Sequence, residues 1–312
     1  MKTLRLTPED DLNERINSAD SGTVIYLKKG VYRQKVEITA SNIKIVGEDR
    51  ENTVITYDDY ARKIHADGQE YNTFRTYTLC ITGDGISLEN LTVENSNTDP
   101  KTVGQCVALS VHGTDFFGRD LDLKSTQDTL FLSPFPDDLV VRYDGFIPKR
   151  QLYREGHSLH AFENCKIYGT VDYVFGCSEA YFKDCDFINI YDNRHEGFVA
   201  APAHHLAEEH GFNFVDCRFM NGGAGESEVF LARPWRDFGK CAFINCKLEN
   251  HLNSALFDKW NDTYRDKTAR FLYFNLEAPL PLSPVTWARE LSPAEAKKII
   301  NNCNDRILKL KK

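Results

Sequence analysis

The chain has 312 residues, a net charge of −8 and 41% hydrophobic residues. This apolar content is sufficient for a large core, while the net negative charge argues against nucleic acid or an anionic membrane as the main partner. No run of about 18 apolar residues is present, so we expect no membrane-spanning helix. The first residues also lack the apolar segment of a secretory signal, and we therefore expect a cytoplasmic protein.

The N-terminal part of the chain combines a helix start with short β-type runs. Thr7, Pro8 and the two acids that follow are typical of a helix N-terminus, and apolar residues then recur near helical spacing. A short helix is therefore expected over residues 8–19. Strands are predicted over residues 23–27, 31–36, 43–46 and 54–57, and a polar loop over residues 58–73.

A short motif recurs along much of the remaining chain at irregular intervals. It consists of an apolar residue, any residue, Asn or Asp, Cys or Leu, a polar residue and a second apolar residue. Its copies begin at Leu88, Phe162, Phe182, Phe214 and Phe243, and a weaker copy begins at Phe117. Alternation with period two is typical of strands, and irregular spacing indicates loops of different length between equivalent strands. We therefore predict an all-β solenoid of stacked parallel coils.

The cysteines of the motif fit such stacking. In a solenoid, Cys165, Cys185, Cys217 and Cys246 would lie one above another as small apolar residues of the interior. Their spacing is not that of a C-x-x-C or Cys/His zinc site. The nine cysteines of the chain are expected to be buried, reduced thiols rather than a disulfide framework. A β-sandwich would also give many strands, but we prefer the solenoid because hairpin turn signals are few.

A second helix is predicted near the C-terminus. Ser292 and Glu295 form a capping box, with Pro at the first helical position. Apolar residues between Ala296 and Ile307 lie on one face of this helix, which we expect to pack along the solenoid. No Pro-, Gly- or Ser-rich linker divides the chain, so we expect one domain over residues 1–312.

Two aspartates stand in apolar, strand-like sequence between residues 123 and 176. They are Asp128, in Gln-Asp-Thr-Leu, and Asp172, in Val-Asp-Tyr-Val-Phe-Gly. An isolated ionised carboxylate is costly to bury. The two residues are therefore either strand-end ions that face water or a matched pair for acid–base or nucleophilic chemistry.

Two other chemistries have little support in the sequence. The segment from His204 to His210 is rich in metal-ligand residue types, but it lacks the His-Glu-x-x-His pattern, and we expect a surface loop. No Gly-x-Ser-x-Gly sequence is present, so a serine esterase of the α/β-hydrolase type is not supported. We assign no metal site and no cofactor.

Five segments carry a more specific signal. They begin at Gly30 (Gly-Val-Tyr-Arg-Gln-Lys-Val), Gln105 (Gln-Cys-Val-Ala-Leu), Gln127 (Gln-Asp-Thr-Leu), Val171 (Val-Asp-Tyr-Val-Phe-Gly) and Leu231 (Leu-Ala-Arg-Pro-Trp). In order and separation they resemble the motifs of the pectin methylesterases, or pectinesterases, over nearly the whole chain. The resemblance implies a right-handed parallel β-helix with short N-terminal and C-terminal helices. It also implies an enzyme that hydrolyses methyl esters of galacturonosyl units and releases methanol.

The resemblance implies a role for each of the polar site residues. Asp172 would be the nucleophile, and Asp128 would be the general acid and base. Arg233 would hold Asp172 ionised and oriented through charge-assisted hydrogen bonds. Gln105 and Gln127 would donate hydrogen bonds to the carbonyl oxygen as negative charge develops on it, and no metal is required.

Three aromatic residues are expected to bind the sugar rings. Trp235 and Phe175 match the aromatic platforms of the family, and Phe131 is a further candidate for the same groove. Gln34 stands where the family usually has Glu, so we assign it no catalytic role. Ala232 replaces the usual Gly before Arg-Pro-Trp. These departures leave the preferred substrate length and methylation pattern open.

The predicted function is removal of methyl esters from pectin or methylated oligogalacturonides. We expect a monomer that acts on short imported oligosaccharides and binds neither nucleic acid nor membrane. Two alternatives stay open: another pectin-active solenoid, such as a lyase or a glycoside hydrolase, and a non-catalytic carbohydrate-binding solenoid. A lyase would need an acid cluster for Ca²⁺, and a hydrolase would need carboxylates set for a glycosidic bond. The presence of both Asp, both Gln and Arg233 favours ester hydrolysis.

Overall fold

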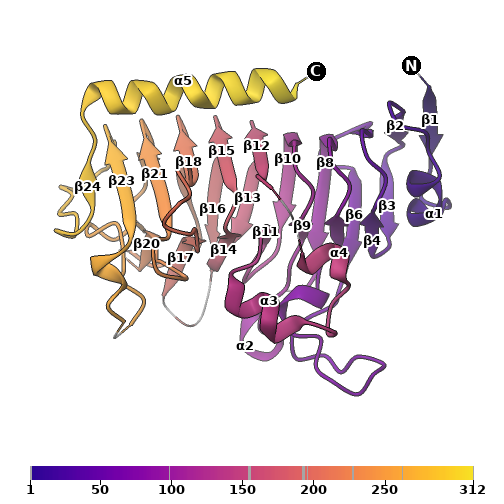
Figure 1. Cartoon of the computed structure of the whole chain (residues 1–312), viewed down its shortest axis with the longest axis horizontal. Helices are drawn as coiled ribbons and strands as arrows, with labels where there is room; N and C mark the ends of the chain where they lie inside the picture. Colours follow the sequence, from indigo (N-terminus) through magenta and orange to yellow (C-terminus); the bar gives the residue numbers. More distant parts are fainter. Residues whose placement is uncertain are drawn as a thin grey trace.

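The structure is a computed structural model that describes residues 2–97, 99–153, 156–191, 194, 196–226, 228–261 and 263–311, except for the side chains of residues 100 and 101. Its strands follow one another in coils that stack along one long axis (Figure 1). The named strands form a 17-stranded and a 7-stranded sheet, and their pairings are parallel. The chain therefore folds as a parallel β-helix, as predicted.

The coils have three faces. The first contains β1 (Thr3–Leu6), β2 (Val24–Leu27), β5 (Lys44–Gly47), the first halves of β8 (Ser87–Asn95) and β10 (Phe116–Lys124), β12 (Leu159–Glu163), β15 (Glu179–Lys183), β18 (Phe212–Val215), β21 (Lys240–Ile244), β23 (Arg270–Phe274) and β24 (Arg289–Glu290). The second contains β3 (Gly30–Arg33), β6 (Thr53–Tyr57), the second halves of β8 and β10, β13 (Lys166–Gly169), β16 (Asp186–Ile190), β19 (Arg218–Gly222) and β22 (Lys247–Leu248). The third contains β4 (Val36–Ile38), β7 (Leu79–Ile81), β9 (Leu109–Val111), β11 (Leu130–Leu132), β14 (Val171–Gly176), β17 (Gly197–Pro202) and β20 (Val229–Ala232).

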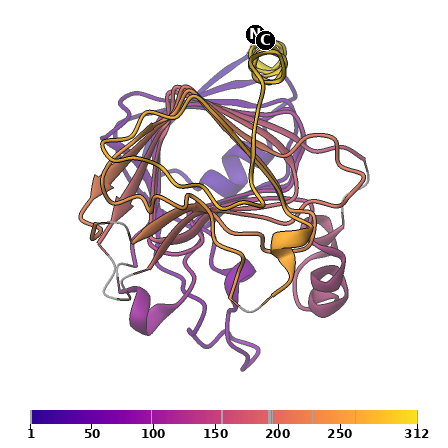
Figure 2. The same ribbon diagram turned by 90° about the vertical axis from the view of Figure 1, so that its left-hand side faces the viewer.

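Helices and helical turns cover the ends and sides of the coils. They are α1 (Leu12–Asn17), η1 (Thr73–Arg75), α2 (Pro100–Val103), α3 (Asp137–Tyr143), α4 (Lys149–Leu152), η2 (Arg265–Lys267) and α5 (Pro293–Leu310). Viewed along the axis, the coils superimpose, and α1 lies at the far end (Figure 2). Leu12 and Ile16 of α1 are buried in the core, so this helix covers its N-terminal end.

The recurring motif explains how each coil turns from the first face to the second. Its Asn or Asp has a left-handed backbone, with φ of 53° at Asn164, 54° at Asp184 and 55° at Asp216. Asn and Asp tolerate this conformation better than other residues with a side chain. The residue after each of them is a buried Cys, and the apolar residue two positions further on is also buried, so the next strand continues with its apolar side chains toward the core.

Stacking of the motif builds the core. The rings of Phe182, Phe214 and Phe243 are stacked, with successive centroids 4.9 and 4.5 Å apart. The four cysteines of the motif form a parallel interior row; for example, the thiol of Cys217 donates to the carbonyl oxygen of Phe182. All nine cysteines are buried and free of disulfides, which confirms that part of the prediction.

The N-terminal helix is shorter than predicted. It begins at Leu12 with Asp11 as N-cap, whereas residues 7–10 form a turn in which Asp10 accepts a hydrogen bond from the N–H of Thr7. The predicted strand over residues 31–36 is also divided at a corner, where Gln34 leaves the β-ladder. The side-chain oxygen of Gln34 accepts a hydrogen bond from the N–H of Leu12 at 2.9 Å. Gln34 therefore stabilises the start of α1.

The C-terminal helix agrees with the prediction. Ser292 and Glu295 form the capping box, and α5 lies across the strands of the first face (Figure 1). Cys303 and Ile307 pack there in a cluster with residues of β10, β12, β15 and β18. Within the described residues, no helix has both the length and the apolar character needed to cross a membrane.

Two segments outside the coils cover the third face. One is residues 58–78, which contain η1, and the other is residues 133–153, which contain α3 and α4; we call them together the wall. The loop over residues 58–73 agrees with the prediction from the sequence, whereas α3 and α4 are not predicted. Both segments lie below the β-helix in Figure 1. They define one side of the cavity described below.

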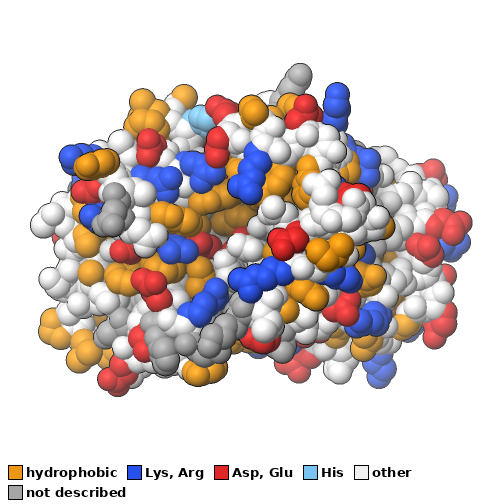
Figure 3. All heavy atoms as spheres, turned by 90° about the horizontal axis from the view of Figure 1, so that it is seen from below, with side chains coloured by type: hydrophobic (Ala, Val, Ile, Leu, Met, Phe, Trp, Pro, Cys, Tyr) orange, Lys and Arg blue, Asp and Glu red, His pale blue; other side chains and the backbone are white. Residues whose placement is uncertain are grey.

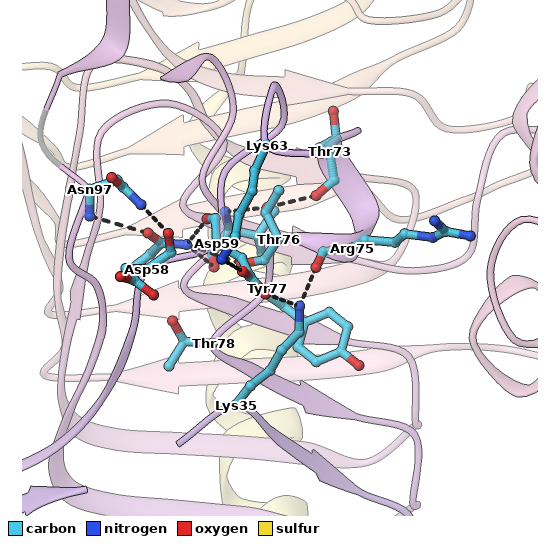
Figure 4. A network of polar contacts seen from close by, with 12 residues as sticks. Lys35, Asp58, Asp59, Lys63, Thr73, Arg75, Thr76, Tyr77, Thr78 and Asn97 are labelled. Carbon is cyan, nitrogen blue, oxygen red and sulfur yellow. Dashed lines mark hydrogen bonds and ion pairs between the residues drawn. The ribbon is translucent and has the colours of Figure 1, made fainter. Parts of the chain in front are cut away.

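A buried ion network anchors the first wall segment (Figure 4). Asp59 is 1% exposed and accepts hydrogen bonds from Lys35 at 2.5 Å and from Lys63 at 2.6 Å. The side-chain amide of Asn95 donates to the carbonyl oxygens of Asp59 and Thr76, at 2.8 and 3.0 Å. Because burial also lowers the pKa of Lys35, this carboxylate and its two lysines depend on one another for charge compensation. The network thereby fixes both ends of the loop.

Candidate active site

A cavity of about 360 Å³ lies between the third face and the wall. Of the predicted site residues, it is lined by Gln105, Gln127, Asp128, Asp172, Phe175, Arg233 and Trp235. Its other lining residues are Asn72, Thr73, Phe74, Leu139, Arg142, Tyr143, Ala201, Arg236 and Trp260. Figure 3 shows this side of the molecule hollowed, with hydrophobic side chains on the floor and Lys and Arg side chains around the border.

Neighbouring coils bring the two aspartates together. The N–H of Asp128 donates to the carbonyl oxygen of Val171 at 3.1 Å, and β11 pairs with β14 in the same register. Both aspartates have a left-handed backbone, with φ of 62° at Asp128 and 51° at Asp172. The register of β14 with β17 shifts just after Val171. These local irregularities let the two side chains leave the alternation of the strands, and strained backbone of this kind is common at functional sites.

Asp172 is held by one arginine. Arg233 donates from Nε to Oδ1 of Asp172 at 2.8 Å and from Nη2 to Oδ2 at 2.7 Å. The guanidinium carbon of Arg233 lies 3.8 Å from the ring centroid of Phe198 and 3.9 Å from that of Trp260. Stacking on both rings and the paired hydrogen bonds fix Asp172 as an oriented carboxylate.

Asp128 has the opposite electrostatic environment. It is 8% exposed, and the side chain of Gln127 lies near its carboxyl group. Burial raises the pKa of Asp128 well above its usual range, and the nearby negative charge of Asp172 raises it further. The two carboxyl groups therefore have different surroundings: Asp172 is paired with a guanidinium, whereas burial favours the neutral form of Asp128.

The two glutamines lie on adjacent coils at the cavity. The N–H of Cys106 donates to the carbonyl oxygen of Gln127 at 3.0 Å, which places the chain at Gln105 beside Gln127. The side-chain oxygen of Gln127 accepts a hydrogen bond from Arg194 at 2.7 Å, so its amide nitrogen faces away from that arginine as a donor. Among the described contacts, the side-chain amide of Gln105 has no protein partner, which leaves it available to a ligand.

The aromatic residues divide into two groups. Trp235 is half-buried at the cavity and contacts Phe175 edge to face, with centroids 5.6 Å apart. The prediction that Phe131 forms part of the groove is wrong, because its side chain is completely buried. Phe74 and Phe135 from the wall cover it, with centroids 5.0 and 4.8 Å away. Phe131 supports the floor of the cavity from behind.

Several residues at the site were missed by sequence reasoning. Trp260 and Phe198 stack on Arg233, Arg194 orients Gln127, and Arg142 lines the cavity from α3. None of them belongs to one of the five motifs. The only available signal was that Trp260 is one of three tryptophans in the chain.

The histidine-rich segment is predicted to be a surface loop, but its first residue, His204, is buried. His204 is 1% exposed; its Nε2 donates to the carbonyl oxygen of Ser178, and its Nδ1 accepts from the N–H of Lys240. Burial lowers the pKa of His204 to about 3, so the ring is neutral. Among the described residues, no group of three or more His, Cys, Asp or Glu side chains is placed to hold a metal ion.

Comparison with known proteins identifies relatives along most of the chain. The sequence model of the family described as Pectinesterase matches residues 6–135 and 139–279. Pectinesterase QRT1 of Arabidopsis thaliana is 26% identical over 290 residues, which cover 88% of this chain and 67% of that protein. The chain spans 43% and 31% of the length of two longer Arabidopsis relatives that are described as pectinesterase/pectinesterase inhibitor.

Solved structures share the fold. The pectin methylesterase from carrot has a TM-score of 0.80 at 20% identity, covering 99% of this chain and 96% of that one. A pectin methylesterase in complex with a hexasaccharide has a TM-score of 0.74 at 23% identity, covering 93% and 90%. These matches establish a common β-helix. Because the family's sequence model also covers most of its length, the chain belongs to the pectinesterase family.

Proposed function

We propose that this chain is a pectin methylesterase that hydrolyses methyl esters of galacturonosyl units through its two aspartates. The observation that carries the proposal is the asymmetry of the two buried carboxyl groups. Asp172 is hydrogen-bonded by Arg233, whereas Asp128 retains its proton because burial and the charge of Asp172 raise its pKa. Ester hydrolysis by carboxyl groups needs such a division into a nucleophile and an acid.

The first half of the reaction forms an acyl-enzyme. A carboxylate oxygen of Asp172 attacks the ester carbonyl carbon, and the carbonyl oxygen becomes negative in a tetrahedral intermediate. The amide groups of Gln105 and Gln127 donate hydrogen bonds to that oxygen. As the C–O bond to the methoxy group breaks, Asp128 transfers its proton to the leaving oxygen, and methanol departs. The product is an anhydride between Asp172 and the substrate.

The second half restores the enzyme. Asp128, now ionised, accepts a proton from water as the water oxygen attacks the substrate carbonyl of the anhydride. The carboxylate of Asp172 leaves and returns to Arg233, and the product departs as the galacturonic acid, which then loses its proton to solvent. Each cycle therefore consumes one ester and one water, and it releases one methanol and one acid.

The surroundings of the two aspartates support binding of a sugar chain. Trp235 is half-buried at the cavity and lies next to Phe175, which also lines it. Aromatic faces of this kind cover the apolar faces of sugar rings. A relative's structure with a bound hexasaccharide belongs to the same fold, which supports an oligosaccharide ligand here.

We also propose that the enzyme works in the cytoplasm on short methylated oligogalacturonides. Its nine cysteines are buried and unpaired, which fits a reducing compartment. Fractionation of cells that express the native gene tests this point directly, since recovery of the protein outside the cell would contradict it.

A methanol-release assay tests the proposed reaction. Methylated pectin and methylated trigalacturonate are the two substrates, and new reducing ends and unsaturated sugars are measured in parallel. We expect methanol from at least one substrate, no cleavage of the glycosidic chain, and no loss of activity in EDTA. Chain cleavage without methanol would favour a lyase or glycoside hydrolase, and no reaction with either substrate would favour a binding protein.

A further inference from the structure

The wall is a fixed part of the cavity. The hydroxyl of Tyr143 on α3 donates to the side-chain oxygen of Asn72 in the first wall segment, at 2.8 Å. Arg75 donates from Nε to the carbonyl oxygen of Phe146 at 3.0 Å, and its guanidinium lies 3.6 Å from the ring centroid of Phe146. These contacts join the two wall segments to each other. Side chains of α3 are therefore presented to the cavity from a fixed position.

The start of α3 lies at a gap in the match to the family's sequence model. The match to the family's sequence model is interrupted at residues 136–138, where α3 begins. The next residues of the helix, Leu139, Arg142 and Tyr143, line the cavity. These positions belong to none of the five motifs that carry the family resemblance, so any specificity that arises from them would be separate from those motifs.

Among the described residues, the charges at the cavity leave one cation without a counterion. Arg233 is paired with Asp172, and Asp128 forms no ion pair among the described contacts. Arg236 is paired with Asp138 through two hydrogen bonds of 2.9 and 2.6 Å.

Arg142 follows Asp138 by one helical turn on α3, which is a favourable spacing for an ion pair. Both oxygens of Asp138 are nevertheless occupied by Arg236. Among the described contacts, Arg142 has no acidic partner, and it is exposed at the cavity. Its guanidinium carbon lies 5.4 Å from the ring centroid of Tyr143, which is a cation–π contact and not an ion pair.

We propose that Arg142 binds an ionised carboxylate of the substrate, on a galacturonosyl unit near the one whose ester is hydrolysed. A guanidinium presents parallel N–H groups that match a carboxylate, and Arg142 has no internal carboxylate to displace. Arg142 is thereby a specificity-determining residue that favours partly esterified oligosaccharides over fully esterified ones. This inference rests on the proposed function, of which it names the preferred substrate class.

Kinetics on two matched substrates test the inference. One is an oligogalacturonide with a single methyl ester, and the other is the fully methylated oligogalacturonide of the same length. Arg142→Gln should lower kcat/KM for the singly methylated substrate by about tenfold, the effect of one specific contact, and change that for the fully methylated one by less than about twofold. Equal effects on both substrates, or none on either, would overturn the inference.

A matched control separates local binding from overall charge. Lys149→Gln removes one positive charge from α4, in the same wall segment, at an exposed residue that does not line the cavity. This variant should keep the substrate ratio of the wild type. Arg142→Lys retains the charge but not the planar pair of donors, and it should fall between the wild type and Arg142→Gln.

A binding measurement keeps the two proposals distinguishable. Trigalacturonate, which carries no ester, is titrated into wild type and Arg142→Gln by calorimetry. A Kd that is at least about fivefold higher in the variant supports the carboxylate contact. If the wild type binds trigalacturonate in this way but releases no methanol, only the proposed reaction is contradicted. Identical Kd values in both proteins would reject the role of Arg142 whatever the activity.

Discussion

Arg233 and Asp172 form a two-bond ion pair, with N–O distances of 2.8 and 2.7 Å, although β20, which ends just before Arg233, and β14, which contains Asp172, are separated by β17 on the third face. The same arginine is stacked against Phe198 and Trp260. Orientation of Asp172, the proposed nucleophile, therefore depends on a planar, doubly donating group. A single positive charge at this position would not reproduce it.

Arg233→Lys should consequently lower kcat by about 10²-fold with a smaller change in KM, because misorientation of a reacting group is felt mainly in the transition state. Arg218→Lys is the control, since Arg218 makes the same paired contact with Asp186 at 2.6 and 2.7 Å but lies outside the cavity. Methanol release measured over a range of substrate concentrations gives kcat and KM for both variants. An equal loss in both variants would point to a general effect on folding.

Asp172→Asn removes the proposed nucleophile and should lower kcat by about 10³-fold or more, as losses of catalytic nucleophiles do. The amide is nearly isosteric, so trigalacturonate should still bind. Asp186→Asn, at the other paired aspartate, should retain activity. Near-wild-type methanol release by Asp172→Asn would remove the nucleophile from the mechanism.

Asp128→Asn should abolish methanol release and stabilise the protein at neutral pH. Because the folded-state pKa of Asp128 is raised, the folded chain binds more protons than the unfolded chain between the usual Asp pKa and the raised one. The stability of the wild type therefore falls as pH rises through this window, relative to that of the variant. Above the window, Tm should be about 2 °C or more higher in the variant.

The difference in Tm should vanish below about pH 4, where Asp128 is protonated in both states. Thermal unfolding of both proteins as a function of pH measures it. In the wild type, kcat should also decline as pH rises through the raised pKa, since the general acid is then lost. A variant that is less stable than the wild type at every pH would contradict the assignment of a protonated Asp128.

Gln127→Ala should lower kcat by about 10²-fold, the usual cost of losing a donor to a developing oxyanion. Gln105→Ala should have an effect of the same kind, since both side chains line the cavity. Gln151→Ala serves as control, because Gln151 is buried but donates to Glu37, away from the two aspartates. Steady-state kinetics on methylated trigalacturonate should show the loss in kcat, and a change confined to KM would instead assign the glutamines to substrate binding.

Asp59→Asn should destabilise the protein by about 2 kcal/mol, because it removes the buried carboxylate that pairs with the partly exposed Lys35 and Lys63. Asp58→Asn is the neighbouring control: Asp58 pairs with Arg33 in an exposed contact, with side chains 42% and 59% exposed. Loss of such a pair costs less than about 1 kcal/mol. Chemical denaturation measures both, and equal values would show that the network in Figure 4 does not anchor the wall.

The sequence alone determined the repeating architecture. The motif that includes Cys185 and Cys217 has strand alternation and a residue that tolerates left-handed backbone, and these are local properties of the chain. Stacking of identical units then follows from burial of each unit's apolar side chains against the next. The motif match likewise identified Asp128, Asp172 and Arg233, which the structure places around one cavity.

Only the tertiary structure decided what covers these residues. Phe131 is buried because Phe74 and Phe135, from two separate wall segments, lie over it. Trp260 stacks on Arg233, although the segment that contains Trp260 matches none of the five motifs. Only the folded structure shows this contact. Burial, protonation and unpaired charge depend on all the groups that surround a side chain in space, and local sequence patterns do not contain that information. For this reason the sequence identified the candidate reacting residues and their expected roles, whereas the burial of Asp128 and the position of Arg142 came from the fold.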